Sequence, residues 1–311
     1  MPTVVLLLSD KRSGSTMLQE ELCLHPKVQH VKYSSHTYFE THHWLKAAVM
    51  LEKSPVLFSG GKVYRTYGTP AKARSYMIDT IKGNLPNYNV PDANSDLVFD
   101  GWEALCAKHS KPVFFEKSPQ ILANWAAVSL ILEWMEKTDY TVKIIGLVRN
   151  PMAVQFSAKN LFATKAETRQ YGWLEIQKNL LTLKNILPPE SFRLIRYEDI
   201  VSNPSSTFND LCDFIGIPHD PKLGAQVNVT SLEKWREDRH YTLQLDSSVV
   251  QIAKAFGYSD DDLYNPSVPS KTSELASKTP LFRQWQIRYY RFRNRVLVPI
   301  YYNIKARFNR Y

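Results

Sequence analysis

The sequence lacks several features of membrane and secreted proteins. Its 311 residues contain no run of about 18 apolar residues, the length that a bilayer-spanning helix needs. The chain begins at its first apolar segment, without the basic and apolar regions of a signal peptide. Cysteine is scarce, and Cys23, Cys106 and Cys212 show no C-x-x-C spacing. We therefore expect a cytoplasmic protein whose cysteines are reduced and serve as small core residues.

Acidic residues are nearly absent from the C-terminal end of the chain. Residues 263–311 hold ten of the 39 Lys and Arg but one of the 30 acids, Glu274, so they account for the whole net charge of +9. Residues 281–311 also interleave arginines with aromatic side chains. We expect one domain over 1–262 and a basic helical extension over 263–311. The extension could contact an anionic membrane surface, an acidic ligand or its own domain, and it resembles no nucleic-acid-binding motif.

Strand and helix patterns alternate along the rest of the chain. Residues 4–8 form an uninterrupted apolar run, which is typical of a strand covered on both faces in a parallel sheet. Further strands are predicted at 113–115, 141–148 and 192–196, and helices at 70–83, 95–109, 121–136, 171–187 and 204–214. This order predicts an α/β fold with a central parallel sheet flanked by helices. Trp125 and Trp134 are expected to anchor the core.

A polar, basic turn joins the first strand to the first helix. It contains Lys11 and Arg12, and the helix begins at the segment Ser13-Gly14-Ser15-Thr16. The first N–H groups of a helix have no acceptor within the helix, and the helix dipole is positive at this end. A phosphate or sulfate is the ligand that such a turn favours.

The turn departs from the nucleotide-triphosphate loop G-x-x-x-x-G-K-[ST] in an informative way. Gly14 and Thr16 match that pattern, whereas Ser9 replaces the first glycine and Ser15 replaces the lysine. The lysine that reaches the β- and γ-phosphates is therefore missing, and two cations lie earlier in the turn. This arrangement indicates an anion that lies less deep than a γ-phosphate.

Three further segments follow the basic turn in order. They are Phe115-Glu116-Lys117-Ser118-Pro119, Leu147-Val148-Arg149-Asn150-Pro151 with Ser157 beyond it, and Arg196-Tyr197-Glu198-Asp199-Ile200. Together with Lys11-Arg12-Ser13-Gly14-Ser15-Thr16, they resemble the sulfotransferases that use 3′-phosphoadenosine-5′-phosphosulfate (PAPS), in particular the carbohydrate, heparan-type and tyrosylprotein members. The matching blocks span residues 3 to about 260. The resemblance implies the P-loop-like fold of these enzymes.

The resemblance also implies roles for individual residues. The 5′-phosphosulfate would be bound by Lys11, Arg12, Ser13, Gly14, Ser15 and Thr16. The 3′-phosphate would be bound by Arg149, whose guanidinium suits bidentate contact, and by Ser157. Lys117, at a strand end, would stabilise charge on the departing phosphate oxygen, with Lys11 or Arg12 providing a second cation. Lys234 and Arg236 are secondary nucleotide-binding candidates.

The sequence leaves open which residue is the base that takes the proton from the acceptor. Family members with an E-x-x-F-like pattern use its glutamate, and alignment on the following phenylalanine places His36 there. Alignment by distance from the preceding helix places Lys32 there instead. Glu40 lies one helical turn beyond His36, and Glu116 lies beside the strand-end lysine. A structural role for His36 is an equal alternative.

The resemblance implies transfer of a sulfuryl group from PAPS to a hydroxyl or amine of a glycan, lipid or small molecule, with release of adenosine 3′,5′-bisphosphate. No metal is expected, because fixed cations would stabilise the leaving group and the sequence offers no metal cluster. The adjacent His42 and His43 lack an H-E-x-x-H pattern and are interpreted as a cap or a substrate rim. Two alternatives remain. They are a P-loop nucleotide kinase or NTPase, and a noncatalytic module that binds anions or membranes.

Overall fold

The computed structural model describes residues 2–53, 58–59, 62–63, 69–162, 164–227 and 232–267, together with residues 285, 288, 289 and 292. Most of the expected basic extension, including the helix expected over 281–311, therefore lies outside the described residues. No helix in the described part of the chain combines the length and the apolar character needed to cross a bilayer.

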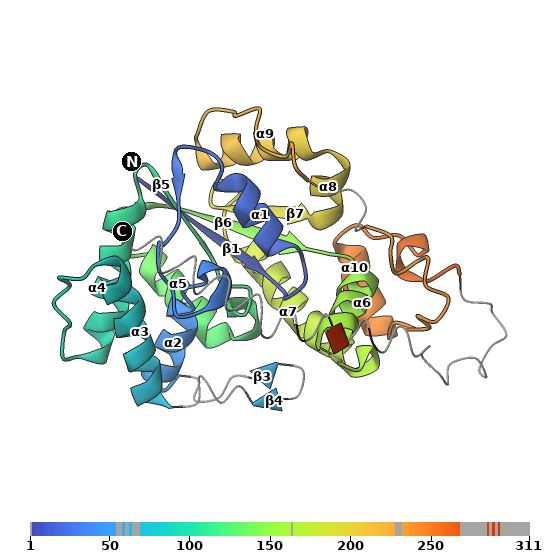
Figure 1. Ribbon diagram of the computed structural model, residues 1–311, viewed down its shortest axis with the longest axis horizontal. Helices are drawn as coiled ribbons and strands as arrows, with labels where there is room; N and C mark the ends of the chain where they lie inside the picture. Colours follow the sequence, from blue (N-terminus) through green and yellow to red (C-terminus); the bar gives the residue numbers. More distant parts are fainter. Residues whose placement is uncertain are drawn as a thin grey trace.

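Five parallel strands form the central sheet, in the order β2-β5-β1-β6-β7 (Figure 1). β1 lies in the middle, and its residue Leu7 is opposite Lys117 of β5 and Ile145 of β6. The C-terminal ends of these strands consequently meet at one edge of the sheet. The strands are β1 Thr3–Ser9, β2 Val28–Gln29, β5 Val113–Lys117, β6 Thr141–Val148 and β7 Phe192–Arg196. The predicted α/β fold with a central parallel sheet is confirmed.

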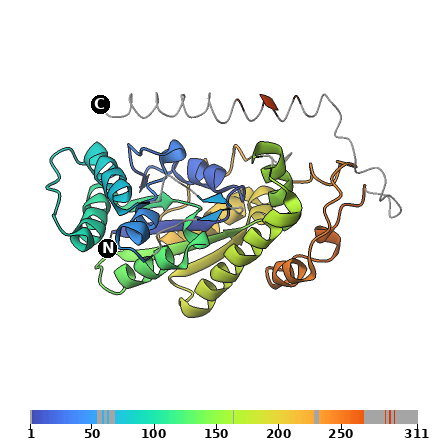
Figure 2. The same ribbon diagram turned by 90° about the horizontal axis from the view of Figure 1, so that it is seen from below.

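Helices cover both faces of the sheet, and α7 lies along one of them (Figure 2). Val5 and Leu7 of β1 contact one buried cluster, whereas Val4, Leu6 and Leu8 contact the other. This double burial explains why the strand shows no polar alternation. The first cluster includes side chains of α1 Ser15–Leu22, α8 Tyr197–Ser202 and α9 Pro204–Ile215. The second includes side chains of α2 His43–Met50, α3 Pro70–Asn84, α4 Asn94–His109, α5 Trp125–Met135, α6 Pro151–Phe162, α7 Ala166–Ile186 and α10 Ser247–Ala255.

Short elements complete the described chain. β3 and β4 pair in an antiparallel arrangement apart from the central sheet. Single 3₁₀ turns lie before α2, before α5 and after α10. The bounds are η1 Thr37–Phe39, β3 Phe58–Ser59, β4 Lys62–Val63, η3 Ile121–Ala123 and η5 Asp261–Leu263.

The two tryptophans expected in the core behave differently. Trp134 is buried and its ring contacts those of Trp44 and Trp102, with centroids 5.8 and 5.9 Å away. Trp125 is 37% exposed, so its assignment to the core was wrong. The two residues are nine positions apart on α5, or about two and a half helical turns, and their side chains therefore lie on opposite sides of the helix.

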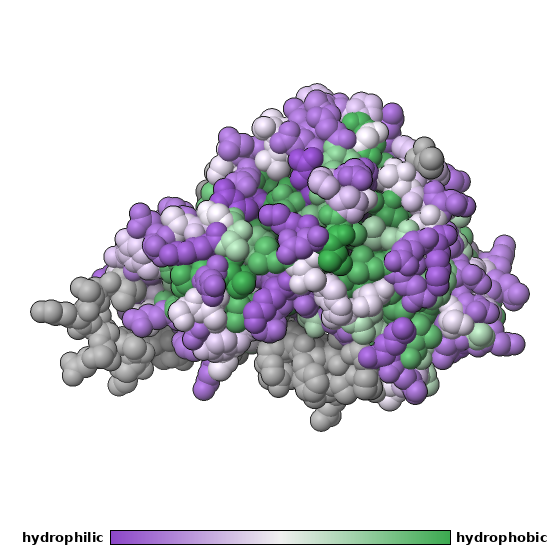
Figure 3. Space-filling model, turned by 180° about the vertical axis from the view of Figure 1, so that it is seen from behind, coloured by the Kyte–Doolittle hydropathy of each residue, from purple (hydrophilic) through white to green (hydrophobic). Residues whose placement is uncertain are grey.

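Apolar and polar residues are intermixed on the outer surface. Figure 3 shows hydrophobic residues between hydrophilic ones over the face seen from behind. The exposed large apolar side chains of the described chain include Leu24, Phe162 and Ile186, which come from different elements. Scattered apolar residues of this kind are ordinary on a globular surface.

Candidate active site

The loop between β1 and α1 is shaped for an anion. Gly14 has a left-handed φ of 93° as the N-cap of α1, and the ring of Tyr197 lies where a Cβ on this residue would be. Both facts require glycine. The hydroxyl of Ser13 is buried and has no hydrogen-bond partner among the described residues. Together with the first N–H groups of α1, this hydroxyl suits a phosphate or sulfate oxygen.

A buried ion pair fixes the start of this loop. Asp10, at the end of β1, accepts hydrogen bonds from Nη2 of Arg169 at 2.9 and 3.1 Å. The same nitrogen donates to the carbonyl oxygen of Lys11 at 3.2 Å, and Nη1 of Arg169 donates to Gln155 at 3.0 Å. Arg169 of α7, itself bonded to Gln155 of α6, therefore holds the start of the loop.

Lys117 links the anion loop to a carboxylate. Its side chain is fully buried at the C-terminal end of β5, beside the end of β1. Its Nζ donates to Thr16 Oγ1 at 3.3 Å and to Glu40 Oε1 at 2.7 Å. One buried cation thus contacts both the first turn of α1 and a candidate base.

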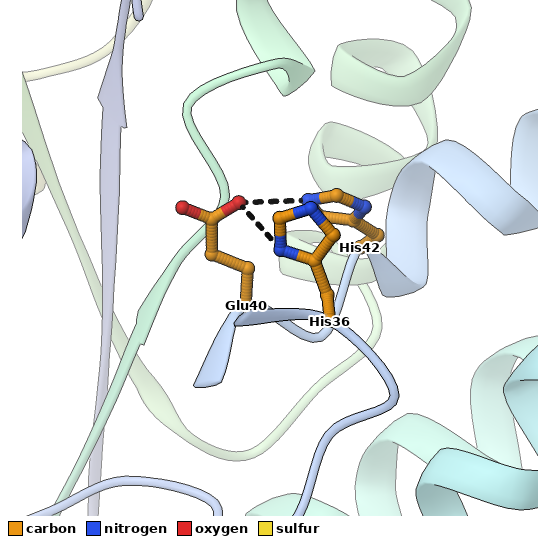
Figure 4. Close-up of side chains that lie close together, drawn as sticks. All are labelled: His36, Glu40 and His42. Atoms are coloured by element: carbon orange, nitrogen blue, oxygen red, sulfur yellow. Dashed lines mark hydrogen bonds and ion pairs between the residues drawn. The ribbon is translucent and has the colours of Figure 1, made fainter. Parts of the chain in front are cut away.

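Two histidines contact the other oxygen of Glu40 (Figure 4). Its Oε2 lies 2.9 Å from Nε2 of His42 and 3.2 Å from Nδ1 of His36. Burial alone would raise the pKa of Glu40, but the Lys117 ammonium and the His42 hydrogen bond outweigh burial and hold this pKa below its usual range. Burial, assisted by repulsion from His36, lowers the pKa of His42 to about 3 despite the nearby carboxylate. The carboxylate is therefore ionised and His42 neutral at pH 7.

The segment that carries this cluster is folded tightly. Tyr38, Phe39 and His42 all have left-handed φ angles, between 51° and 66°. The hydroxyl of Ser34 donates to the carbonyl oxygen of Glu40 at 2.5 Å and accepts from the backbone N–H of His36 at 3.0 Å. This hydroxyl joins the two ends of the turn and brings the carboxylate and the imidazole together.

Glu116 braces the same segment from β5. Its Oε1 accepts from the backbone N–H of Thr41 at 3.2 Å, from the Thr41 hydroxyl at 2.8 Å and from Ser118 at 2.5 Å. Burial raises the pKa of Glu116. Its bonds go to Thr41 and Ser118, so the structure places it as a support for the Glu40 segment.

A second basic cluster lies beside the loop. Nε of Arg12 donates to Ser157 Oγ at 3.0 Å, and Nη1 of Arg149 donates to the carbonyl oxygen of Arg12 at 3.2 Å. The Arg149 guanidinium also stacks over the Tyr197 ring, 4.1 Å from its centroid. Arg12 therefore links the two residues expected to hold the 3′-phosphate, because its guanidinium donates to Ser157 and its carbonyl oxygen accepts from Arg149. Lys117 is the cation that contacts Thr16.

The profile of one protein family, described as the sulfotransferase family, matches residues 4–221, which include both clusters. The chain belongs to the sulfotransferase family. No curated protein matches the sequence.

The fold of this sulfotransferase is similar to that of solved sulfotransferase domains. The domain from the olefin synthase of Synechococcus PCC 7002 is 21% identical, with a TM-score of 0.57 over 83% of this chain and 96% of that one. The domain from the curacin biosynthetic pathway is also 21% identical, with a TM-score of 0.56 over 83% of this chain and 99% of that one. These similarities support the fold assignment.

The secondary nucleotide-binding candidates of the sulfotransferase, Lys234 and Arg236, lie in the segment between α9 and α10. Arg236 donates to the carbonyl oxygen of Asp261 at 2.9 Å and lies 3.5 Å from carboxylate oxygens of Glu233 and Asp262. Lys234 is exposed. Lys11 is partly buried in the loop, where its carbonyl oxygen accepts the Arg169 bond.

Several contributors to the sulfotransferase site were not anticipated from the sequence. Asp10, Arg169 and Thr41 were not singled out, and His42 was interpreted as a cap or rim residue. Asp10 directly precedes Lys11 and Arg12 in the sequence, but the cation that pairs with it in the structure is Arg169. Nothing local to residue 169 indicates that it supplies this cation.

Proposed function

We propose that this sulfotransferase moves a sulfuryl group from PAPS to a hydroxyl or amine of an acceptor and releases adenosine 3′,5′-bisphosphate. The observation that carries the proposal is the position of Lys117, whose ammonium contacts Thr16 in the anion loop and Glu40 at the same time. A cation placed between an anion site and a carboxylate can serve a leaving group and a base in one reaction.

The residues of the loop fit the donor. The first N–H groups of α1 and the unpartnered Ser13 hydroxyl would hold its 5′-phosphosulfate, and Arg149, Ser157 and Arg12 its 3′-phosphate. The donor supplies an activated sulfuryl group, and the family generally uses PAPS. Arg12 connects the other two members of the proposed 3′-phosphate site, because its guanidinium donates to Ser157 and its carbonyl oxygen accepts from Arg149.

Glu40 is the base in this scheme. The acceptor oxygen forms a bond to sulfur, the bond from sulfur to the phosphate oxygen breaks, and Glu40 takes the acceptor proton. Lys117 stabilises the negative charge that appears on the phosphate oxygen. His42 holds the carboxylate in place through its 2.9 Å contact, and His36, whose side chain is 34% exposed, contacts the same oxygen at 3.2 Å.

The alternatives explain less of the site. A nucleotide kinase or NTPase would use a lysine within the loop, where this chain has Ser15. A noncatalytic module has no need for the buried pair of Lys117 and Glu40, which costs desolvation free energy. A glycan, a lipid or a small metabolite would each offer the required hydroxyl.

The deciding experiment is calorimetric titration with adenosine 3′,5′-bisphosphate, 5′-AMP and Mg-ATP. We expect the bisphosphate to bind at least about tenfold more tightly than 5′-AMP, and Arg149→Ala to remove this preference by deleting one charged contact. Arg193→Ala, on the exposed side of β7, is the control and should bind as the wild type does. Equal binding of bisphosphate and 5′-AMP, or a preference for Mg-ATP, would overturn the proposal.

A further inference from the structure

Three potential metal ligands converge beside the anion loop. Nδ1 of His36, Oε2 of Glu40 and Nε2 of His42 all lie within 4.8 Å of one another (Figure 4). Two imidazoles and one carboxylate form a ligand set that suits Zn²⁺ and similar transition metals better than Mg²⁺ or Ca²⁺. We propose that this cluster is a binding site for Zn²⁺ and that the metal inhibits the enzyme by occupying Glu40.

The spacing of the ligand atoms is close to that of a zinc site. Zinc bonds to nitrogen and oxygen are about 2.0–2.2 Å long, so two ligands at a tetrahedral angle lie ~3.3 Å apart. The two contacts of Glu40 Oε2 are 2.9 Å to His42 and 3.2 Å to His36. Both contacts are within a few tenths of an ångström of that spacing, and the three ligand atoms all lie within 4.8 Å of one another.

The surroundings hold the ligands in position, and one of the three ligands is partly exposed. Ser34 bonds to the backbone at both His36 and Glu40, and the backbone N–H of His42 donates to Ser118 at 3.1 Å. Glu40 and His42 are buried, whereas the side chain of His36 is 34% exposed. A metal can enter past His36 and keep a water molecule as its fourth ligand, as open zinc sites do.

Lys117 limits the affinity of this site. Its ammonium is 2.7 Å from the other oxygen of Glu40 and would repel a divalent ion bound to Oε2. We therefore expect reversible binding that a chelator reverses. Because a metal on Oε2 takes the lone pair that would accept the acceptor proton, bound zinc should block turnover without blocking the donor loop.

The test measures metal binding directly. The purified full chain is titrated calorimetrically with Zn²⁺, and with Co²⁺ while the visible absorption that reports tetrahedral nitrogen and oxygen ligation is recorded. We expect 1:1 binding that weakens at least about tenfold in His36→Ala and in His42→Ala. His219→Ala is the matched control, because His219 forms an exposed pair with Asp213, and both residues are remote in sequence from the cluster. This variant should bind zinc as the wild type does.

The fold and the function are controlled separately. Because half-exposed His36 tolerates truncation better than buried His42, His36→Ala is the decisive variant, and unchanged titration with adenosine 3′,5′-bisphosphate shows that its fold is intact. Absence of 1:1 binding, or undiminished binding by His36→Ala, overturns the metal site. The proposal that zinc inhibits the enzyme rests on the proposed function. If the zinc-bound enzyme turned over at the full rate, the metal site would stand, but Glu40 could not be the base.

Discussion

At the residue scale, the buried pair of Lys117 and Glu40 joins stability to chemistry. Each charge is shielded from water and compensated by the other at 2.7 Å. Removing either partner alone leaves an uncompensated buried charge, which typically costs about 3–5 kcal/mol. A loss of activity in a single variant could therefore reflect unfolding, and the two effects have to be separated.

Lys117→Met should lower turnover by about 100-fold or more, because the Lys117 ammonium contacts Thr16 in the anion loop, where we propose that the leaving oxygen lies. The affinity for adenosine 3′,5′-bisphosphate should fall much less, since most donor contacts lie elsewhere. The double variant Lys117→Met/Glu40→Gln should regain melting temperature without regaining turnover. Single-turnover kinetics and thermal unfolding measure both, and a fully active Lys117→Met enzyme would remove this lysine from the mechanism.

At the element scale, the turn from Ser34 to His42 positions the base through its backbone. Thr41 is its link to β5, because the Thr41 hydroxyl donates to Glu116 at 2.8 Å and accepts from the backbone N–H of His43 at 3.2 Å. A loss of this link should loosen the turn while the anion loop keeps its own support from Arg169.

Thr41→Val should therefore lower turnover by roughly tenfold and leave the affinity for adenosine 3′,5′-bisphosphate unchanged. The free energy of unfolding should fall by about 1–3 kcal/mol, because a buried acceptor loses a donor. Thr182→Val, on the exposed face of α7, is the matched control. Steady-state kinetics and urea unfolding test this, and equal losses of affinity and turnover would show that the turn also shapes the donor site.

Sequence patterns predicted the elements better than the turn. β1 and β6 were predictable because strands buried on both faces leave continuous apolar runs. The convergence of His36, Glu40 and His42 depends on three residues with left-handed φ angles, which no hydrophobic pattern in the sequence predicts. Arg169 could not be paired with Asp10 from the sequence, because 159 residues separate them and α7 brings them together. The prediction that Trp125 lies in the core was wrong because the hydrophobicity of a residue does not show which side of the helix it occupies.

At the scale of the whole molecule, buried neutral histidines make the fold sensitive to acid. His109 ends α4, contacts the Phe114 ring and has no hydrogen-bond partner for Nε2 among the described residues. Burial, aided by nearby positive charges, lowers the pKa of His109 to about 4. The unfolded chain takes up this proton near pH 6.5, so the stability of the fold falls as pH drops from about 6.5 to 4.

His109→Leu should reduce this acid-induced loss by about 2 kcal/mol at pH 5 relative to pH 8. The measurement is urea unfolding of the wild type and the variant at both pH values. His219→Leu, which alters an exposed histidine, should leave the difference unchanged. An identical pH dependence in wild type and His109→Leu would show that this histidine is protonated equally in the folded and unfolded chains.

The parallel order of the strands also has a consequence for synthesis on the ribosome. The anion loop precedes the other parts of the site in the chain, because Lys117 comes 101 residues after Thr16 and Ser157 comes 145 residues after Arg12. The nascent loop therefore carries Lys11 and Arg12 from the start but gains Lys117, Arg149 and Ser157 only after β5, β6 and α6 have been made. We therefore expect a translation product that ends before β5 to lack both the ammonium at Thr16 and the Ser157 contact of Arg12, and so not to hold the proposed donor.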